Sequence, residues 1–315
     1  MVYIYENRIN NAVVTRHYWK RAKPLKIIKF VAVAAVMLAS FVHLSTAWAD
    51  VSIGILAPRG KLKAMNRWKD FGSYMQEQLG QPVTIVPLPP GDVLNSVKGK
   101  QVDLIMSNPV HAVNIVERFS GHPLATLNKK SGPVFAGVIV SRKGSGINTA
   151  EDLRGKKVMS LKFRAAAGAY TFQTYHLHQK GIDPHNDFAS MVAGKKQDDL
   201  VLAVKAGVID AAFVRSGILE SMAKEGKIKL DEFTIVDQRR DELGLVHSTQ
   251  LYPEWFMLSL PHTDAGLASQ VKQALLSLNA QHPAAVSARI QGFVEPISLQ
   301  PMATALRELK IAPFN

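Results

Sequence analysis

The chain has 315 residues, long for one ordinary domain and sufficient for two domains or for two lobes of one fold. Apolar residues make up 47% and charged residues 20%, which excludes an intrinsically disordered chain, and the absence of cysteine excludes disulfides, thiolate metal sites and a cysteine nucleophile. Of the formal net charge of +13, residues 1–49 hold seven basic residues and one acid; the rest holds 31 basic and 24 acidic residues, a net of +7 that does not favour nucleic acid as a partner.

Residues 1–49 are typical of an export signal. Six basic residues between positions 16 and 29 precede an uncharged apolar stretch at 30–42, and Ala47-Trp48-Ala49 has the small-x-small pattern of a signal-peptidase site. We expect cleavage before Asp50 and a soluble mature chain in the periplasm of a bacterium with two membranes. An uncleaved membrane anchor over residues 27–49 is the alternative. The long segment before the apolar stretch also leaves open whether Met1 is the true start.

From residue 51 onward, strand-like and helix-like segments alternate with short connections. Short apolar runs indicate strands, and apolar positions three or four residues apart indicate helices, with Met65, Trp68, Phe71, Tyr74 and Leu79 expected on the inward face of one helix. The β-α-β-α-β order predicts open, mostly parallel sheets. The expected strands are 51–56, 83–88, 102–106, 134–140, 157–161, 211–214 and 255–260, and the expected helices are 63–79, 93–97, 110–117, 149–153, 168–179, 198–206, 217–225, 265–279 and 301–309.

Two apolar strands, near 134–140 and 255–260, bracket the middle α/β block. A chain that leaves one lobe, builds a second and returns would use such strands as a two-strand hinge, with a ligand cleft between the lobes. The predicted fold class is therefore α/β, with two lobes, each a mostly parallel sheet flanked by helices. Lobe 1 comprises 50–137 plus 256–315, and lobe 2 comprises 138–255.

Several stretches are typical of one family of receptors. They are Ile53-Gly-Ile-Leu-Ala-Pro-Arg-Gly, Asp103-Leu-Ile-Met-Ser-Asn-Pro, Gly168-Ala-Tyr, Gly181-Ile-Asp-Pro, the segment 203–217 and Leu251-Tyr-Pro-Glu-Trp. They resemble the phosphate/phosphite/phosphonate-binding family of ABC-importer solute receptors, and within it they are most similar to the periplasmic sensor modules of tetrathionate-type histidine kinases. The resemblance implies a type II periplasmic binding protein that closes over a small ligand. Since no kinase domain follows Asn315, a free receptor is expected.

Departures from the family pattern bear on the ligand. Phosphonate binders of the family present a Ser-Thr-Ser-Gly-like turn, where this chain has Ala165-Ala166-Ala167-Gly168. The family's ligand-contacting His falls at about Gln197 and its acidic ligand residue near Arg215. We therefore expect an oxyanion or a carboxylate, such as a sulfur oxyanion that suits Arg forks, rather than a phosphonate.

Arg59 and Ser107-Asn108 are the first candidate ligand residues. Each follows a predicted strand of the first block, at the carboxyl end where open α/β sheets bind ligands. The Arg59 guanidinium suits a bidentate grip on an oxyanion, and its alternative is a solvated surface position beside Lys61 and Lys63. The alternative for Ser107-Asn108 is an N-cap of the following helix.

The remaining candidates belong to the middle block and the predicted return hinge. Arg164, Ala167, Gly168 and Tyr170 join a strand to a helix whose N–H groups suit an anion, the alternatives being an Ala-rich helix start and, for Tyr170, core packing. Arg215 would add a second positive charge from the opposite lobe to Arg59, its alternative being a salt bridge to Glu220 or Asp210. Tyr252 either lines the cleft or wedges it, and Trp255 is expected to pack.

A metal, a cofactor and catalysis are not expected. His176 and His178 are two residues apart on a helix and point to different faces, so with His185 they predict a solvated helix rather than a metal site. No hydrolase or nucleotide-binding motif occurs, which disfavours a periplasmic hydrolase. The sequence predicts a monomeric solute-binding protein that delivers a small anion to an ABC-importer permease in the inner membrane. The alternative is a sensor receptor for a separate histidine kinase.

Overall fold

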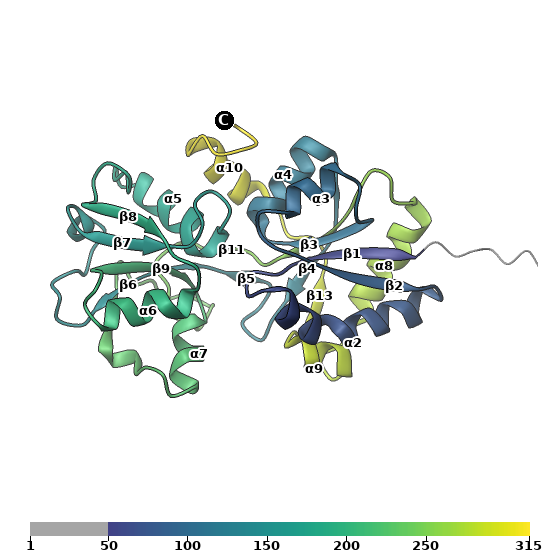
Figure 1. Cartoon of the computed structure of the whole chain (residues 1–315), viewed down its shortest axis with the longest axis horizontal. Helices are drawn as coiled ribbons and strands as arrows, with labels where there is room; N and C mark the ends of the chain where they lie inside the picture. Colours follow the sequence, from purple (N-terminus) through teal and green to yellow (C-terminus); the bar gives the residue numbers. More distant parts are fainter. Residues whose placement is uncertain (1–49) are drawn as a thin grey trace, which may run out of the picture. The chain divides into compact units, whose positions relative to one another are not determined.

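The computed structural model describes residues 50–315. Their strands form two larger sheets, each accompanied by helices, with a short two-stranded ribbon between them (Figure 1). The predicted signal peptide, and with it the alternative membrane anchor, lies outside the described residues. Between residues 50 and 315, no helix is long and apolar enough to cross a membrane.

The first sheet is six-stranded and mixed. Strand β1 is parallel to β2 and β3, whereas β12 is antiparallel to both β3 and β4, and β13 is antiparallel to β4. The prediction of a mostly parallel sheet is wrong here, because the chain leaves this sheet through β4 and re-enters it as β12. In sheet order the strands are β13 (Gly292–Val294), β4 (His122–Asn128), β12 (Phe256–Ser259), β3 (Leu104–Ser107), β1 (Val51–Leu56) and β2 (Val83–Leu88), and the accompanying helices are α2 (Lys61–Leu79), α3 (Val93–Lys98), α4 (Pro109–Phe119), α8 (Ala265–Ser277), α9 (Pro283–Ala288) and α10 (Gln300–Glu308).

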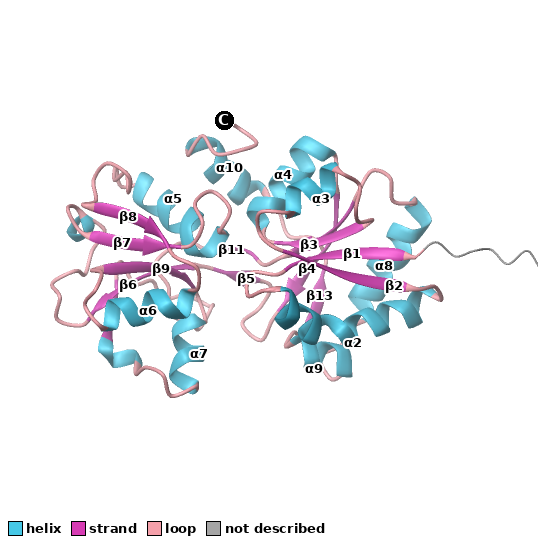
Figure 2. Ribbon diagram, viewed as in Figure 1, coloured by secondary structure: helices cyan, strands magenta, loops and turns pink. Residues whose placement is uncertain are grey.

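The second sheet is five-stranded and also mixed. Strand β7 is parallel to β8 and β9, while β6 is antiparallel to β9 and β10. In sheet order the strands are β10 (Phe233–Ile235), β6 (Gly137–Arg142), β9 (Ala211–Arg215), β7 (Lys157–Ser160) and β8 (Ser190–Ala193). The helical segments are η1 (Glu151–Leu153), the π-helix η2 (Ala167–Thr171), α5 (Phe172–His178), α6 (Gln197–Lys205), α7 (Ile218–Lys224) and η3 (Leu230–Glu232) (Figure 2).

The ribbon between the sheets consists of β5 (Val134–Phe135) and β11 (Tyr252–Pro253), which pair in antiparallel fashion. The chain crosses from the first sheet to the second through β5 and returns through β11. A two-strand connection was predicted, but its strands were misplaced: residues 137–140 belong to the second sheet, and 256–259 lie inside the first. The predicted lobe limits themselves stay a prediction.

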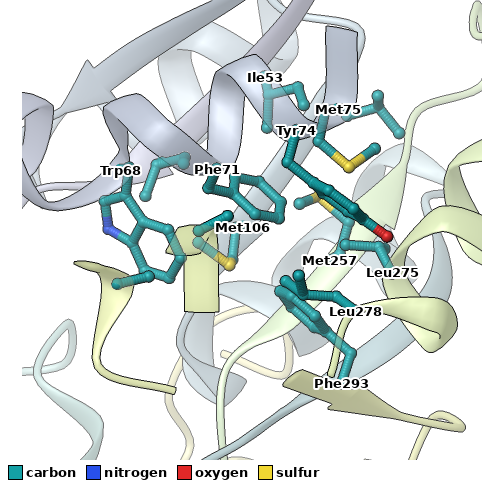
Figure 3. Packing of buried hydrophobic residues seen from close by; sticks show 14 of the residues in the cluster. Ile53, Trp68, Phe71, Tyr74, Met75, Met106, Met257, Leu275, Leu278 and Phe293 are labelled. Atoms are coloured by element: carbon teal, nitrogen blue, oxygen red, sulfur yellow. The ribbon is translucent and has the colours of Figure 1, made fainter. Parts of the chain in front are cut away.

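The core beneath the first sheet is built largely by one face of α2. Figure 3 shows Trp68, Phe71 and Tyr74 of this helix beside Met106, Met257 and Phe293 of the strands. The predicted inward face of α2 is confirmed except at Met65, which is 39% exposed. Only Ala64 is buried in the first turn, so this turn projects beyond the core.

Candidate functional site

A buried carboxylate joins cations from both sheets where the chain crosses between them. Glu254 directly follows β11 and is fully buried. Its Oε1 lies 2.7 Å from Nη2 of Arg215, the last residue of β9, and 3.0 Å from Nζ of Lys129, which follows β4. Burial alone would raise the pKa of Glu254, but Arg215 and Lys129 outweigh that effect and hold it below its ordinary value. Glu254 is therefore the charged partner of two cations.

The same buried environment lowers the pKa values of two basic groups, Lys129 and Arg67. Burial, followed by the nearby Arg215, lowers the pKa of Lys129 to about 8. Burial and Arg215 also lower the pKa of Arg67, on α2, to about 10, while the Glu254 carboxylate opposes that shift. Arg67 donates from Nε to the Ala288 carbonyl at 2.8 Å. Lys129, Arg215 and Glu254 thus form one ion-paired unit, called here the cation cluster, and Arg67 lies within electrostatic range of it.

Arg215 is held on several sides. Its guanidinium carbon lies 4.5 Å from the ring centroid of Phe135, and its Nε donates to the Ser216 carbonyl. Its backbone N–H donates to Oε1 of Gln197 at 2.7 Å. The expected alternative partners, Glu220 and Asp210, are wrong: the acid that pairs with Arg215 is Glu254.

Arg59 lies outside this cluster, and its pair with Asp198 forms an exposed region called here the rim. Its side chain is 55% exposed, and its Nη2 lies 3.2 Å from Oδ1 of Asp198 in the first turn of α6. Lys227 approaches the other oxygen of Asp198 at 3.2 Å. The segment after β1 and the start of α6 therefore meet through an ion pair. The structure does not bring Arg59 and Arg215 onto one acceptor, because each pairs with a different acid.

The junction between β3 and α4 faces the turn after β7. Asn108 is the N-cap of α4, accepting from the His111 N–H, and its Nδ2 also donates to the Ala165 carbonyl at 3.3 Å. Ser107 is fully buried, with Oγ 2.8 Å from Nδ1 of His111. Burial, helped by the charge of Lys162, lowers the pKa of His111 to about 4, so the ring is neutral at pH 7.

The turn at 162–168 is tightly packed against the ribbon. Arg164 is exposed and adopts a left-handed backbone with φ of 62°. A Cβ on Gly168 would lie 2.6 Å from Cε2 of Phe135 and 3.1 Å from Cβ of Arg215, so the missing side chain admits Phe135. The buried Gln173 donates from Nε2 to the Gly168 and Val214 carbonyls, which fixes the π-helix on the second sheet.

Both candidate tyrosines are buried. Tyr170 is 2% exposed, its hydroxyl lies 2.8 Å from Nε2 of His185, and its ring contacts Phe163. Tyr252 is 1% exposed and stacks on Phe172 with the ring centroids 3.9 Å apart. Trp255 is half-buried and packs against the core of the first sheet, as expected.

The prediction of a solvated histidine helix is wrong for most of α5. Five of its seven residues are buried, and only His178 of its two histidines is exposed. His176 is largely buried, with Nε2 2.7 Å from Oδ2 of Asp237. This contact with Asp237 accounts for the position of the ring without requiring a metal. Residues 50–315 contain no group of three His, Asp or Glu side chains placed to hold a metal ion.

Comparison with known proteins identifies the family. The profile described as "ABC transporter, phosphonate, periplasmic substrate-binding protein" matches residues 53–298. The chain belongs to this family. It is also 31% identical over 274 residues to the tetrathionate sensor histidine kinase TtrS of Salmonella typhimurium, in a match that covers 85% of this chain and 45% of the kinase. The chain thus spans about half the length of this relative.

Solved structures confirm the predicted fold class, a two-lobed type II periplasmic binding protein. An ATP-bound protein from Xanthomonas citri has a TM-score of 0.68 at 16% identity, covering 83% of this chain and 98% of the other. PhnD1 from Prochlorococcus marinus in complex with methylphosphonate has a TM-score of 0.66 at 15% identity, covering 82% and 98%. A binding component of a phosphonate transporter from Pseudomonas aeruginosa has a TM-score of 0.67 at 16% identity, covering 83% and 87%.

Sequence reasoning missed Arg67, Lys129, Glu254 and Asp198. Glu254 carried a signal, since it is an acid between Tyr252 and Trp255, two aromatic residues of the predicted return hinge, and a buried acid requires a cation. Lys129 and Arg67 carried none, because only the fold brings them toward residues far away in sequence.

Proposed function

We propose that this chain is a periplasmic receptor that binds a small anion between its two sheets and delivers it to an ABC-importer permease. One observation carries the proposal: cations from both sheets, Lys129 and Arg215, converge on a single buried carboxylate beside the crossing ribbon. Positive charge concentrated in a partly buried site attracts and retains an anion. The proposed receptor is a monomer and performs no catalysis.

The proposed ligand contacts surround this point. Arg59 lies at the rim, Arg164 is exposed on the facing turn, and Arg215 lies in the cation cluster. The contact from Asn108 to Ala165 brings the β3–α4 junction beside that turn. The complete set comprises Arg59, Ser107, Asn108, Arg164, Ala167, Gly168, Tyr170, Arg215 and Tyr252.

The proposed ligand is an oxyanion or a carboxylate rather than a phosphonate. Ala165, Ala166 and Ala167 carry no hydroxyl, so the turn that they form offers an anion only backbone donors. A phosphonate would leave oxygens without partners, at a cost of about 1–3 kcal/mol for each buried group.

A thermal-shift screen of sulfur oxyanions, carboxylates and phosphonates, followed by calorimetry, tests this proposal. A ligand at about 100 times its Kd adds roughly 2.7 kcal/mol of apparent stability, which shifts the melting temperature measurably. At least one oxyanion or carboxylate should bind. Sub-micromolar affinity for 2-aminoethylphosphonate would refute the ligand class.

Sensing is the second candidate, and the match to the tetrathionate sensor kinase favours it. In that case the receptor would report its ligand to a separate kinase in the inner membrane, and tetrathionate belongs in the screen. A strain lacking this gene separates the two: loss of ligand uptake supports import, whereas loss of ligand-dependent transcription with normal uptake supports sensing.

Export is part of the proposal and rests on the sequence of residues 1–49. Mass spectrometry of the chain recovered from periplasm should show Asp50 as the first residue. Recovery of the uncleaved chain from the membrane fraction would support an anchored receptor instead.

A further inference from the structure

The buried imidazole of His247 lies between two hydrogen-bond acceptors. Its side chain is 1% exposed, and it belongs to the segment that leads from β10 back to the ribbon. Its Nδ1 lies 2.9 Å from the carbonyl oxygen of Leu245, and its Nε2 lies 2.9 Å from Oδ2 of Asp241. A carbonyl oxygen only accepts, so Nδ1 must donate to it. The contact with Asp241 therefore decides how many protons the ring carries.

A neutral imidazole cannot make both contacts while Asp241 is ionised. If its one N–H is at Nδ1, the lone pair of Nε2 faces the carboxylate, and if the N–H is at Nε2, the lone pair of Nδ1 faces the Leu245 carbonyl. One added proton removes this conflict. The side chain of Asp241 is 22% exposed, which favours its ionised form and places the added proton on the ring.

Asp241 is the charged group in direct contact with the ring, and the other charges nearby are farther away or exposed. On α7, Oε1 of Glu220 accepts from the N–H of Val246, the residue before His247, at 2.8 Å. The contacts of the next two residues with β6 involve only backbone groups of that strand. Solvent screens the remaining charged residues of the segment, which are exposed. They are Arg239, Arg240 and Glu242.

The ring ties together a loop that the main chain closes. The Arg239 N–H donates to the His247 carbonyl at 2.9 Å, so residues 239–247, called here the return loop, turn back on themselves. The imidazole then joins the closing residue to Asp241 and Leu245, which lie inside the loop. Losing the hydrogen bond at either nitrogen releases one of these two ties.

The return loop ends directly before the residues that anchor the crossing ribbon. Ser248 donates its N–H to the Gly137 carbonyl at 2.9 Å and accepts at Oγ from the Ile139 N–H at 2.9 Å. The Gly137 N–H donates to Oγ1 of Thr249 at 2.9 Å. Gly137 follows β5 by two residues and pairs with Arg215 of the cation cluster, and β11 begins three residues after Thr249. The fold of the return loop is thus connected to both strands of the ribbon.

We propose that His247 and Asp241 form a proton-dependent clip that keeps the return loop folded and braces the crossing ribbon. While the pair holds its added proton, both ring nitrogens donate and the loop stays closed. When the proton leaves at higher pH, one hydrogen bond becomes a contact between two acceptors, and the loop opens more often. The clip adds a pH response to the receptor and does not depend on which ligand the receptor binds.

Nitrogen NMR of the mature chain labelled with ¹⁵N-histidine tests for the added proton. Both ring nitrogens of His247 should be protonated at pH 7, with the signals assigned by their loss in His247→Gln. A ring with one unprotonated nitrogen at pH 7 would overturn the clip. Continuing the titration to pH 10 gives the pH at which the proton leaves.

Trypsin cleavage after Arg239 and Arg240 measures the opening of the return loop, because a protease needs the chain released from its fold. A peptide of residues 236–243, cleaved in parallel, corrects for the pH response of trypsin. The corrected rate should rise roughly tenfold or more once the proton has left, as expected for losing one charge-assisted hydrogen bond. His247→Gln should be cleaved fast at every pH. His178→Gln, at an exposed histidine of α5, is the control and should match the parent.

Asp241→Asn distinguishes a proton-dependent clip from simple packing. The amide can donate to Nε2 while Nδ1 donates to Leu245, so a neutral ring makes both contacts without an added proton. Cleavage of this variant should stay slow and change little between pH 6 and pH 10. Opening that follows pH as in the parent, or a proton that stays on His247 up to pH 10, would overturn the clip. Anion binding at pH 7 is measured separately, so failure of the clip leaves the proposed function standing.

Discussion

Two ion-pair regions link distant parts of the chain, and they differ in burial. Arg59 and Asp198 pair at 3.2 Å with side chains 55% and 26% exposed. Glu254, which pairs with Arg215 at 2.7 Å, is fully buried, and Arg215 is 21% exposed. Solvent screens the first pair and competes for its donors, whereas the second has lost most of its hydration and depends on its partners.

This difference predicts two roles for positive charge in the proposed receptor. An exposed pair opens at little cost, so we expect Arg59 to exchange Asp198 for a ligand. The buried pair cannot open without stranding Glu254, so Arg215 and Lys129 should stay in place and offer only their unused donors. We therefore expect the rim to adapt to a ligand and the cation cluster to be fixed before the ligand binds.

The largest expected effect is at the buried carboxylate. Glu254→Ala removes the partner of two cations and should lower the free energy of unfolding by roughly 3–5 kcal/mol, measured by urea denaturation at pH 7. Asp198→Ala serves as the matched control and should change it by less than about 1 kcal/mol. Equal effects from the two substitutions would contradict the distinction between the regions.

His111 tests how burial affects a basic group that has no acid partner. Its folded-state pKa of about 4 lies below the ordinary 6.5, so the unfolded chain binds the proton first as the pH falls. The parent should lose about 3 kcal/mol of stability between pH 6.5 and pH 4, at 1.36 kcal/mol per pKa unit. His111→Gln should lack this part of the loss, and identical pH profiles would argue against a neutral buried ring.

Gly168 offers a way to disturb the buried region without changing its charge. An added methyl group in Gly168→Ala meets Phe135 at 2.6 Å and must displace that ring, over which Arg215 lies. Overpacking of this kind costs about 1–3 kcal/mol in thermal or urea unfolding. Gly91→Ala, whose new methyl group would meet only the end of the Lys162 side chain, is the control. A neutral Gly168→Ala would show that the turn is loosely packed.

The smallest effect on stability is expected at the rim. Arg59→Ala should change the free energy of unfolding by less than about 1 kcal/mol, because the pair with Asp198 is exposed. Its effect on anion affinity, measured by calorimetry, should exceed its effect on stability. A large loss of stability with unchanged affinity would make Arg59 a structural residue.

The sequence predicted the alternation of strands and helices well because buried strands such as Leu104–Ser107 and Ala211–Arg215 are apolar runs. It missed strands with weaker patterns. Residues 190–193 form β8 at a sheet edge with no buried residue, and 122–128 form β4 although a proline lies within them. The mixed direction of the sheets follows from where the chain crosses between them, which local pattern does not encode.

The candidate site was predictable in part. Arg215 and Gly168 were chosen from different segments, and the fold places them against each other. The acid that pairs with Arg215 was not found, because 39 residues separate it from Glu254 and nearer acids were available in sequence. Lys129 enters the site only because β4 ends where β9 also ends, which is a property of the fold.

The most direct test of the account is a diffraction experiment on the mature chain with saturating selenate, a dianion whose selenium gives an anomalous peak. We predict a peak within hydrogen-bonding distance of Nζ of Lys129 and the guanidinium of Arg215. A selenate peak found only elsewhere on the chain would contradict an anion site at the cation cluster.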